Sequence, residues 1–420
     1  MGSFHITGGI PLFGEVKIGG CKNAVLPMLA AAILGGGVSV IRGCPVISDT
    51  MASLEILRRL GCEARIDGDV ITIDSSGLNS FEMPRDLVAE MRSSIIFMGG
   101  LLGRCGRARI SAPGGCNIGE RPIDLHLNGL RKLGAVIDEN EDSGIMDCSA
   151  DRLTGARINL TYPSVGATQN IMLAATLADG ETIITNAAKE PEIEDLQGML
   201  NASGAQIKGA GTHRIVIKGV GRLHDVDYTI MPDRIIAGTY LSAAAITRGS
   251  VLLTNVNHSH IAPIVSPLIK MGAKVTTEPG AISLAAPSGL SAIDFLSTQP
   301  HPGFPTDMQA QFTALLTQCN GTSILAETVF ESRCGHVPPI IQMGADITTS
   351  LNNSTFVIRG VTPLHGIEAA ATDLRSGAAL ILAGLAANGN SQITNTSHIL
   401  RGYEDIAGDL RQLGADVRYE

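Results

Sequence analysis

One short motif recurs six times along this chain of 420 residues, at nearly constant spacing. Each time an apolar, helix-like stretch ends in Gly-Ala or Gly-Cys, and a segment of alternating polar and apolar residues follows. The six glycines are 68 to 73 residues apart and stand at Gly61, Gly134, Gly204, Gly272, Gly344 and Gly414. One such glycine is an ordinary helix cap. Six at this spacing indicate a single folding unit repeated along the chain, and the chain length favours two domains.

Each unit is predicted to contain a strand, a helix, a second strand, a second helix and a hairpin. The first helix of each unit is apolar nearly all round, over residues 24–34, 95–102, 167–177, 235–246, 310–316 and 377–387. Helices of this kind lie inside a protein, whereas alternating strands leave one face exposed. The sequence therefore predicts an α/β fold with helices inside and sheets outside.

The two ends of the chain complement each other. Residues 416–420 supply one strand too few for the last hairpin, and residues 4–7 alternate like the missing strand. We expect the N-terminus to close the last unit. The predicted domains are residues 22–229, and residues 1–21 together with 230–420.

Composition excludes several classes of protein. The net charge of -9 argues against bulk nucleic-acid binding. The eight cysteines lack zinc-site spacing and are interpreted as free thiols of a reducing compartment. The N-terminus does not resemble a signal peptide, and no apolar run is long enough to span a bilayer. We expect a cytoplasmic protein without nucleic-acid, membrane or metal partners.

A glycine-rich loop carries Cys116, and Arg121 follows within a few residues. A thiol near a guanidinium and a helix start has a lowered pKa, and Pro122 is predicted to open that helix. The loop could therefore carry a nucleophile or general acid. It could equally hold a buried structural cysteine, because free cysteines are often buried.

Basic residues recur at matched turns of the repeats. They are Lys22, Arg92, Arg121, Arg234, Arg333, Arg375 and Arg401. If these turns meet in one cleft, they suit a substrate with several phosphates or carboxylates. Each alone could be a surface residue, Asp233 and Asp373 could be N-caps, and the residues leave the role of His126 undecided.

The chain resembles the UDP-N-acetylglucosamine 1-carboxyvinyltransferase family over its whole length. The similarity is carried by Gly-Gly-Cys21-Lys22-Asn23, Met91-Arg92-Ser93-Ser94, Pro113 through His126, Ser164-Val165-Gly166, His301 through Gln311, Glu327 through Glu331, Thr372 through Arg375, and Arg401-Gly402-Tyr403-Glu404. The resemblance implies an inside-out α/β barrel of two domains, each with three βαβαββ units. It also implies transfer of enolpyruvate from phosphoenolpyruvate to the 3'-hydroxyl of UDP-N-acetylglucosamine, with release of phosphate.

The resemblance also assigns roles to residues. Cys116 would be the general acid and Asp307 the base, with Lys22 and Arg401 as further catalytic residues. The phosphoenolpyruvate site would comprise Lys22, Asn23, Arg121, Arg375 and Arg401. The UDP-N-acetylglucosamine site would comprise Asn23, Arg92, Arg121, Pro122, Ile123, Asp124, Leu125, Ser164, Val165, Gly166, Asp307 and Val329. No cofactor, metal or obligate protein partner is implied. Tyr162-Pro163 departs from the family pattern, which has a lysine-like residue there.

The family performs the first committed step of peptidoglycan precursor synthesis, which links it to cell shape and division. Members with the loop cysteine are sensitive to fosfomycin, whereas some members carry aspartate instead. Three alternatives stay open: an enzyme acting on shikimate phosphate, an enolpyruvyl transferase for another nucleotide, and a catalytically silent sugar-nucleotide sensor.

Overall fold

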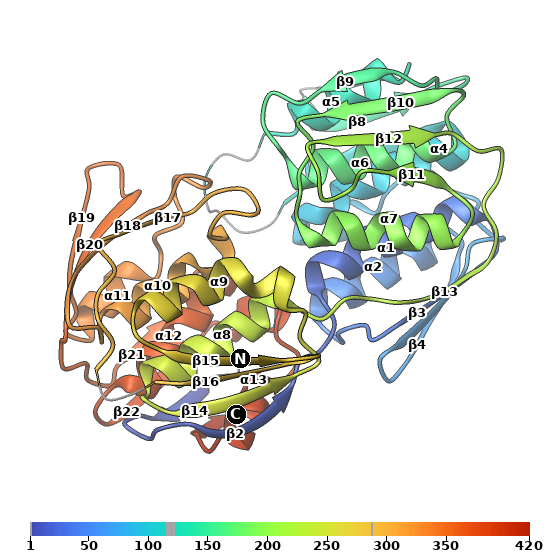
Figure 1. Cartoon of the computed structure of the whole chain (residues 1–420). Helices are drawn as coiled ribbons and strands as arrows, with labels where there is room; N and C mark the ends of the chain where they lie inside the picture. The colour runs from blue at the N-terminus through green and yellow to red at the C-terminus, as the bar shows by residue number, and fades with distance from the viewer. Residues whose placement is uncertain (1, 115–118, 120–121, 141, 287–288) are drawn as a thin grey trace. The chain divides into compact units, whose positions relative to one another are not determined.

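The structure, a computed structural model, describes residues 2–114, 119, 122–140, 142–286 and 289–420. It divides into two compact α/β units (Figure 1). The C-terminal unit combines residues 2–19 with residues 232–420. The N-terminal unit comprises residues 20–114 and 122–231. Each unit is described by itself below.

Three helices form the centre of the N-terminal unit: α1 (Lys22–Gly35), α4 (Phe97–Cys105) and α6 (Val165–Thr176). Nearly every residue of α1 and α6 is buried. The described strands form three sheets around them, in the orders β13-β3-β5-β4, β6-β8-β7 and β11-β12-β10-β9. These strands are β3 (Val38–Arg42), β4 (Glu63–Asp67), β5 (Val70–Asp74), β6 (Arg107–Ser111), β7 (Val136–Asn140), β8 (Ile145–Ser149), β9 (Arg157–Asn159), β10 (Glu181–Thr185), β11 (Gln206–Lys208), β12 (Arg214–Lys218) and β13 (Val226–Thr229).

The C-terminal unit follows the same plan. Its central helices are α8 (Arg234–Ile246), α10 (Gln309–Leu316) and α12 (Leu374–Ala386), which contact one another. The sheet orders are β15-β16-β14-β2, β17-β18-β20-β19 and β21-β22-β1-β23. The strands are β1 (Phe4–Thr7), β2 (Phe13–Lys17), β14 (Ser250–Thr254), β15 (Lys274–Glu278), β16 (Ala281–Ala285), β17 (Phe295–Ser297), β18 (Gly321–Ala326), β19 (Asp346–Thr349), β20 (Thr355–Gly360), β21 (Glu368–Ala370), β22 (Asn390–Thr394) and β23 (Asp416–Tyr419).

Shorter or more amphipathic helices complete both units. In the N-terminal unit they are α2 (Ser48–Arg59), α3 (Arg85–Glu90), η1 (Arg92–Ile96), α5 (Asp124–Lys132) and α7 (Pro191–Ala202). In the C-terminal unit they are α9 (His258–Lys270), η2 (Thr306–Met308), α11 (Val337–Gln342), η3 (Thr396–Arg401) and α13 (Ile406–Gln412). The helix α5 begins at Asp124, two residues after Pro122, so the prediction that Pro122 opens it is wrong. An acidic side chain in the first turn is favoured by the helix dipole.

The interior helices pack closely because they carry small residues. A Cβ atom added at Gly99 of α4 would lie 2.2 Å from the carbonyl oxygen of Asn170 in α6. One added at Gly100 would lie 2.7 Å from the carbonyl oxygen of Ala30 in α1. Real Cβ atoms do not approach so closely. Any larger side chain at either position would force the three helices apart.

The ends of the chain meet in one sheet of the C-terminal unit. The strand β1 lies between β22 and β23 and pairs antiparallel with both, so that Ile6 faces Ser391 on one side and Val417 on the other. The next strand, β2, pairs in parallel with β14 of the same unit. The strand that precedes α1 in the sequence therefore belongs to a sheet of the C-terminal unit. Its counterpart β13 pairs in parallel with β3.

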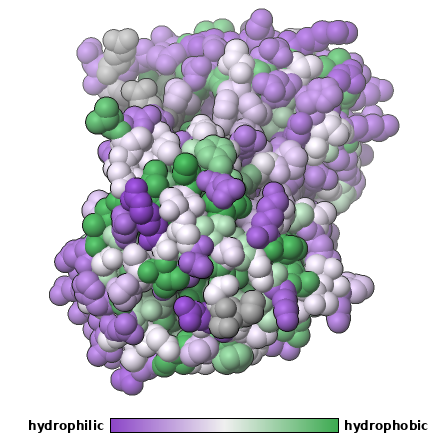
Figure 2. Space-filling model, turned by 60° about the vertical axis from the view of Figure 1, so that its left-hand side comes forward, coloured by the Kyte–Doolittle hydropathy of each residue, from purple (hydrophilic) through white to green (hydrophobic). Residues whose placement is uncertain are grey.

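In Figure 2 hydrophilic residues predominate on the visible face, with apolar residues between them. Among the described residues, no helix is both long enough and apolar enough to cross a membrane.

The position of β1 leads to a test of stability. Ile6 is 1% exposed at the centre of β1, so Ile6→Ala leaves a cavity and is expected to lower the free energy of unfolding by about 2–5 kcal/mol. Thr7→Ala, next to it on the more exposed face of the strand, is expected to cost less than about 1 kcal/mol. Urea denaturation measures both. Equal costs for the two variants would show that the strand contributes little to the core.

Candidate active site

One carboxylate and two guanidiniums form a cluster in the C-terminal unit. Asp307 lies in η2, just before the buried helix α10. Its Oδ1 atom lies 2.8 Å from a terminal nitrogen of Arg333, and its Oδ2 atom lies 2.8 Å from a terminal nitrogen of Arg375. The two arginine side chains are only 7% and 4% exposed, whereas that of Asp307 is 23% exposed. The carboxylate is thus the part of the cluster that solvent can reach.

The two cations determine the charge state of Asp307. Burial by itself would raise the pKa of this carboxyl, but Arg375 and Arg333 outweigh burial and hold it well below its usual range. Burial likewise opposes the charge of Arg375, and Asp307 reverses that effect and raises the pKa of the guanidinium. The cluster therefore carries one negative and two positive charges at neutral pH.

A second carboxylate, that of the buried Glu327, organises the loop around Arg333. Its Oε1 atom accepts hydrogen bonds from the Thr298 hydroxyl and from the backbone N–H groups of Val329 and Phe330, at 2.8 to 3.1 Å. Its Oε2 atom accepts from the Thr306 hydroxyl at 2.8 Å. Arg333 donates to the same hydroxyl oxygen, also at 2.8 Å. Glu327 thus connects the predicted substrate contact Val329 to the residue before Asp307.

Arg375 stands in the first turn of α12. The side chain of Asp373 caps this helix, accepting from the N–H groups of Arg375 and Ser376 at 2.9 and 3.1 Å. Asp233 caps α8 in the same way, so the N-cap interpretation of these two aspartates is confirmed. Asp307 caps neither helix. Arg401, also predicted as catalytic, is the last residue of η3 and is partly exposed.

In the N-terminal unit, the predicted residue Lys22 begins α1. Its Nζ atom lies 2.8 Å from the Oδ2 atom of Asp49 in the first turn of α2, and both side chains are about nine-tenths buried. A buried cation requires such a partner. The ion pair holds the ammonium group in one place at the end of the helix, beside the partly buried Asn23.

The other residues of this unit that are predicted to contact UDP-N-acetylglucosamine, and that the structure describes, lie at or near the first residues of three helices. Arg92 begins η1 and donates to the carbonyl oxygen of Pro113 at 3.2 Å, and burial lowers its pKa. Ser164 caps α6 by accepting from the N–H of Ala167 at 3.3 Å, with Val165 and Gly166 in the first turn. Pro122, Ile123, Asp124 and Leu125 lead into α5 and are exposed or partly exposed.

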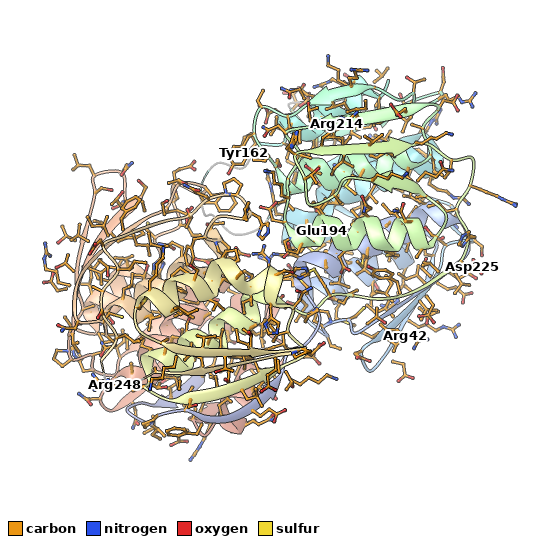
Figure 3. All side chains as sticks on the ribbon, in the orientation of Figure 1. Arg42, Tyr162, Glu194, Arg214, Asp225 and Arg248 are labelled. Atoms are coloured by element: carbon orange, nitrogen blue, oxygen red, sulfur yellow. The ribbon has the colours of Figure 1, made fainter. Side chains whose placement is uncertain are left out.

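Two predicted residues, Cys116 and Arg121, lie outside the described residues. Tyr162, which departs from the family pattern, is 43% exposed just before α6 (Figure 3). The structure also adds three residues that were not among the predicted site residues, Asp49, Glu327 and Arg333. Each of them could have been found from the sequence. Arg333 is one of the basic residues that recur at matched turns, and Glu327 begins one of the motifs shared with the family. Asp49 lies in the first turn of a helix.

The placement of the cations has a chemical consequence. Lys22, Arg92 and Arg375 all stand in the first turn of a helix, where the dipole disfavours positive charge. Such positions already gather backbone N–H donors. Cations and N–H groups together form a setting for phosphate and carboxylate groups.

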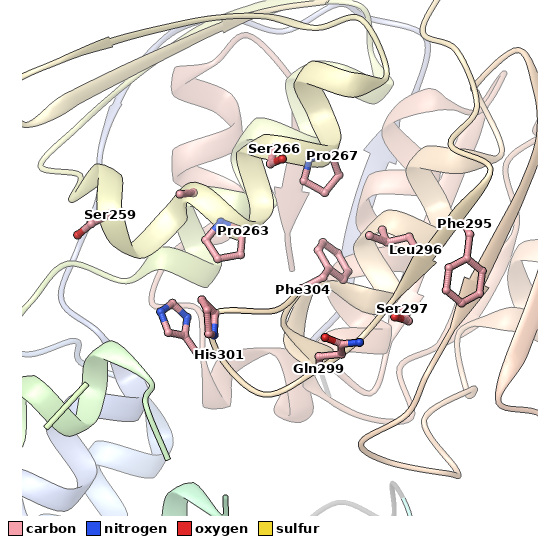
Figure 4. Close-up of a pocket in the computed structure, with 12 residues that line it drawn as sticks. Ser259, Pro263, Ser266, Pro267, Phe295, Leu296, Ser297, Gln299, His301 and Phe304 are labelled. Carbon is pink, nitrogen blue, oxygen red and sulfur yellow. The ribbon is translucent and has the colours of Figure 1, made fainter. Parts of the chain in front are cut away.

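A separate cavity of about 530 Å³ lies between α9 and residues 295–304 (Figure 4). Its walls include Pro263 and Pro267 of α9, facing Leu296, His301 and Phe304. Among the residues that the structure describes, none of those lining this cavity was predicted from the sequence to bind substrate. The described residues also contain no group of His, Cys, Asp and Glu arranged to hold a metal ion.

The described cysteines are free thiols. Burial raises the pKa of Cys44, Cys148 and Cys319 to about 12 and that of Cys62 to about 11. Burial also raises the pKa of Cys105 and Cys334. Because the thiolate is the reactive form, the raised pKa values lower the reactivity of these six thiols at neutral pH.

Comparisons with known proteins relate this geometry to a family. A family model described as EPSP synthase (3-phosphoshikimate 1-carboxyvinyltransferase) matches residues 6–410. UDP-N-acetylglucosamine 1-carboxyvinyltransferase 2 of Caldanaerobacter subterraneus subsp. tengcongensis is 49% identical over 99% of both chains. UDP-N-acetylglucosamine 1-carboxyvinyltransferase of Myxococcus xanthus is 46% identical over the full length of both.

Solved structures agree on the fold. The enolpyruvyl transferase NikO of Streptomyces tendae superposes with a TM-score of 0.90 at 29% identity, covering 100% of this chain and 98% of that one. EPSP synthase of Acinetobacter baumannii superposes with a TM-score of 0.77 over the full length of both chains, and at 21% identity it shows the fold alone. The two-domain α/β fold is therefore that of the enolpyruvyl transferases. The chain belongs to the EPSP synthase family and, within it, to the UDP-N-acetylglucosamine 1-carboxyvinyltransferases.

Proposed function

We propose that this protein transfers enolpyruvate from phosphoenolpyruvate to the 3'-hydroxyl of UDP-N-acetylglucosamine and releases inorganic phosphate. The observation that carries the proposal is the set of cations at helix starts in both units, together with a carboxylate held by two guanidiniums. Both substrates are polyanions that need such cations. Relatives 46–49% identical over essentially the whole chain bear the name of this activity.

The first step needs an acid. Carbon 2 of phosphoenolpyruvate becomes electrophilic when carbon 3 accepts a proton, and the Cys116 thiol would donate that proton. The sugar 3'-hydroxyl then forms a bond to carbon 2 and gives its proton to Asp307, which yields a tetrahedral ketal. Phosphate then leaves carbon 2 with the electron pair of the C–O bond, and one carbon 3 proton passes to a base such as the Cys116 thiolate, which restores the double bond. Lys22, Arg121 and Arg401 would bind the phosphate and carboxylate groups and offset the developing charge.

The geometry of Asp307 sets a condition on this step. Both carboxylate oxygens already contact guanidinium groups, which lower the pKa of the carboxyl. Each oxygen keeps a lone pair that can accept the proton of the sugar, so the condition is that an ion pair weakens and makes the carboxylate more basic. Arg375 is the partner that would also contact phosphoenolpyruvate, whereas Arg333 is held by Thr306. Binding of phosphoenolpyruvate to Arg375 would therefore raise the basicity of Asp307 when the reaction needs it.

The finer assignments belong to the same proposal. Each unit would be an inside-out α/β barrel of three βαβαββ repeats, with domain boundaries after residues 21 and 229. The protein would act in the cytoplasm, in the first committed step of peptidoglycan precursor synthesis and thus in cell division and shape. It would need no cofactor, metal or obligate protein partner.

Phosphate release tests the reaction itself. Wild-type protein with phosphoenolpyruvate is expected to release phosphate only when UDP-N-acetylglucosamine is present. Loss of a general acid typically costs about 10²–10⁴-fold in rate. We therefore expect the Cys116→Ser variant to release phosphate at least about 100-fold more slowly than wild type. A folded wild type that releases no phosphate with this acceptor, but does with shikimate 3-phosphate or another nucleotide sugar, would contradict the proposal. Binding without any turnover would favour the sensor alternative.

The pH dependence of kcat/KM tests the base. Only ionised Asp307 can accept a proton, and the two arginines keep it ionised to low pH. Arg333→Met removes one cation while burial persists, so the pKa of Asp307 rises and the acidic limb of the profile moves to higher pH. Arg333→Lys keeps a positive charge and is expected to move the limb less.

Asp307→Asn is the control for that assignment. This variant is expected to lose turnover, and with it the acidic limb of the pH profile of kcat/KM, while both substrates still bind. Near-normal turnover of Asp307→Asn would assign the base role to another group.

Fosfomycin tests the loop cysteine. The epoxide is expected to add to a single thiol, that of Cys116, because burial raises the pKa values of six other cysteines and Cys21 is buried. Peptide mapping by mass spectrometry locates the adduct. Cys116→Asp retains a proton donor and is expected to remain active and resistant. An adduct at another cysteine that accounts for inactivation would refute the role of Cys116.

A further inference from the structure

Three segments of the N-terminal unit carry the predicted contacts to the sugar nucleotide. They begin with Arg92 of η1, with Pro122 ahead of α5, and with Ser164 at the cap of α6. The first two segments are joined by hydrogen bonds to one fully buried side chain, that of Asn170, which belongs to α6, the helix that the third segment begins.

The amide group of Asn170 is fully used. Its Oδ1 atom accepts from the N–H of Gly99 in α4 at 2.6 Å. Its Nδ2 atom donates to the carbonyl oxygen of Ile95 in η1 at 3.0 Å, and it lies 3.0 Å from Nδ1 of His126 in α5. Exchanging the oxygen and nitrogen would set donor against donor at Gly99 and acceptor against acceptor at Ile95. The orientation of the amide is therefore determined by its neighbours.

This orientation also determines the state of His126. Since Nδ2 of Asn170 can only donate, Nδ1 of His126 must be the acceptor and carries no proton. The imidazole ring is accordingly neutral, with its proton on Nε2. The ring is 7% exposed, so the hydrogen bond is well shielded from water and breaking it would leave a buried donor unpaired.

Glycines allow α5 and α6 to pack so closely that no space is left between them. A Cβ atom at Gly166, in the first turn of α6, would lie 2.9 Å from Cε1 of His126. One at Gly129 of α5 would lie 2.3 Å from Cδ1 of Ile171. The start of α6 therefore rests directly on the ring of His126, and α5 and α6 cannot shift along each other without a clash.

We propose that Asn170 and His126 are positioning residues for UDP-N-acetylglucosamine, which hold the starts of η1, α5 and α6 in the arrangement that the nucleotide requires. The proposal rests on the proposed function. Each residue of this hydrogen-bond network lies about one helical turn or less from a residue predicted to contact the nucleotide. Ile95 is three residues after Arg92, and His126 directly follows Leu125. Asn170 is four residues after Gly166. Displacement of the network would thus be transmitted to all three segments.

The decisive comparison is between two variants of His126. His126→Asn keeps an acceptor near the position of Nδ1, whereas His126→Leu has similar bulk and leaves the amide of Asn170 with an unpaired hydrogen. We expect His126→Leu to raise the Kd for UDP-N-acetylglucosamine, measured by calorimetry without phosphoenolpyruvate, by about tenfold, the equivalent of one buried hydrogen bond. His126→Asn is expected to recover most of this loss, and Asn170→Ala to lose at least as much as His126→Leu.

Kinetics separate positioning from a role in the chemical step. Loss of binding common to ground and transition states raises KM and leaves kcat unchanged, so the variants are expected to keep kcat and the KM for phosphoenolpyruvate. Thr176→Val is the matched control, because Thr176 is a buried residue of the same helix whose hydroxyl donates to the carbonyl oxygen of Met172 at 2.8 Å, remote from the helix start. It is expected to lower stability without changing the Kd.

The outcomes distinguish this inference from the proposed function. If wild-type protein does not bind UDP-N-acetylglucosamine, the proposed function fails. If wild type binds it and folded His126→Leu binds equally well, or Thr176→Val weakens binding as much at equal loss of stability, the positioning role is overturned. If Asn170→Ala does not fold, the pair of His126 variants still decides.

Discussion

The constraint on which this structure depends is the nearly complete burial of three helices in each unit. Helices such as α1, α6 and α12 have no polar face, so charged side chains can reach water or a ligand only at their ends. Lys22 and Arg375 stand at such ends. The same burial that stabilises each unit thus restricts its chemistry to the turns where helices begin.

Charges at these positions require compensation, and the way it is achieved matters for function. Lys22 has Asp49, whereas Arg333 and Arg375 share the carboxylate of Asp307. A partly exposed carboxylate between two buried guanidiniums is held in place and kept ionised. Under the proposed function, an anionic substrate that competes for one arginine would weaken this pairing and make Asp307 more basic.

Polar groups deeper in the N-terminal unit serve a different purpose. Asn170 satisfies backbone groups that close packing at Gly99 would otherwise leave unpaired, and it orients His126 as well. A buried network of this kind specifies one arrangement of its elements, because any other leaves a polar group without a partner. Hydrophobic contacts alone would permit several.

Much of the architecture was determined by local sequence patterns. The apolar runs predicted at 24–34, 167–177 and 377–387 are the helices Lys22–Gly35, Val165–Thr176 and Leu374–Ala386, because burial all round leaves a strong local signal. The alternation of residues 4–7 also predicted that the N-terminus closes the last unit, where β1 pairs with β22 and β23. The tertiary structure alone decided that β2 lies beside β14 and which charges meet, since Arg333 and Asp307 are 26 residues apart in the sequence. The periodicity of apolar residues shows which residues are buried. Which residues they contact depends on how segments distant in the sequence pack together.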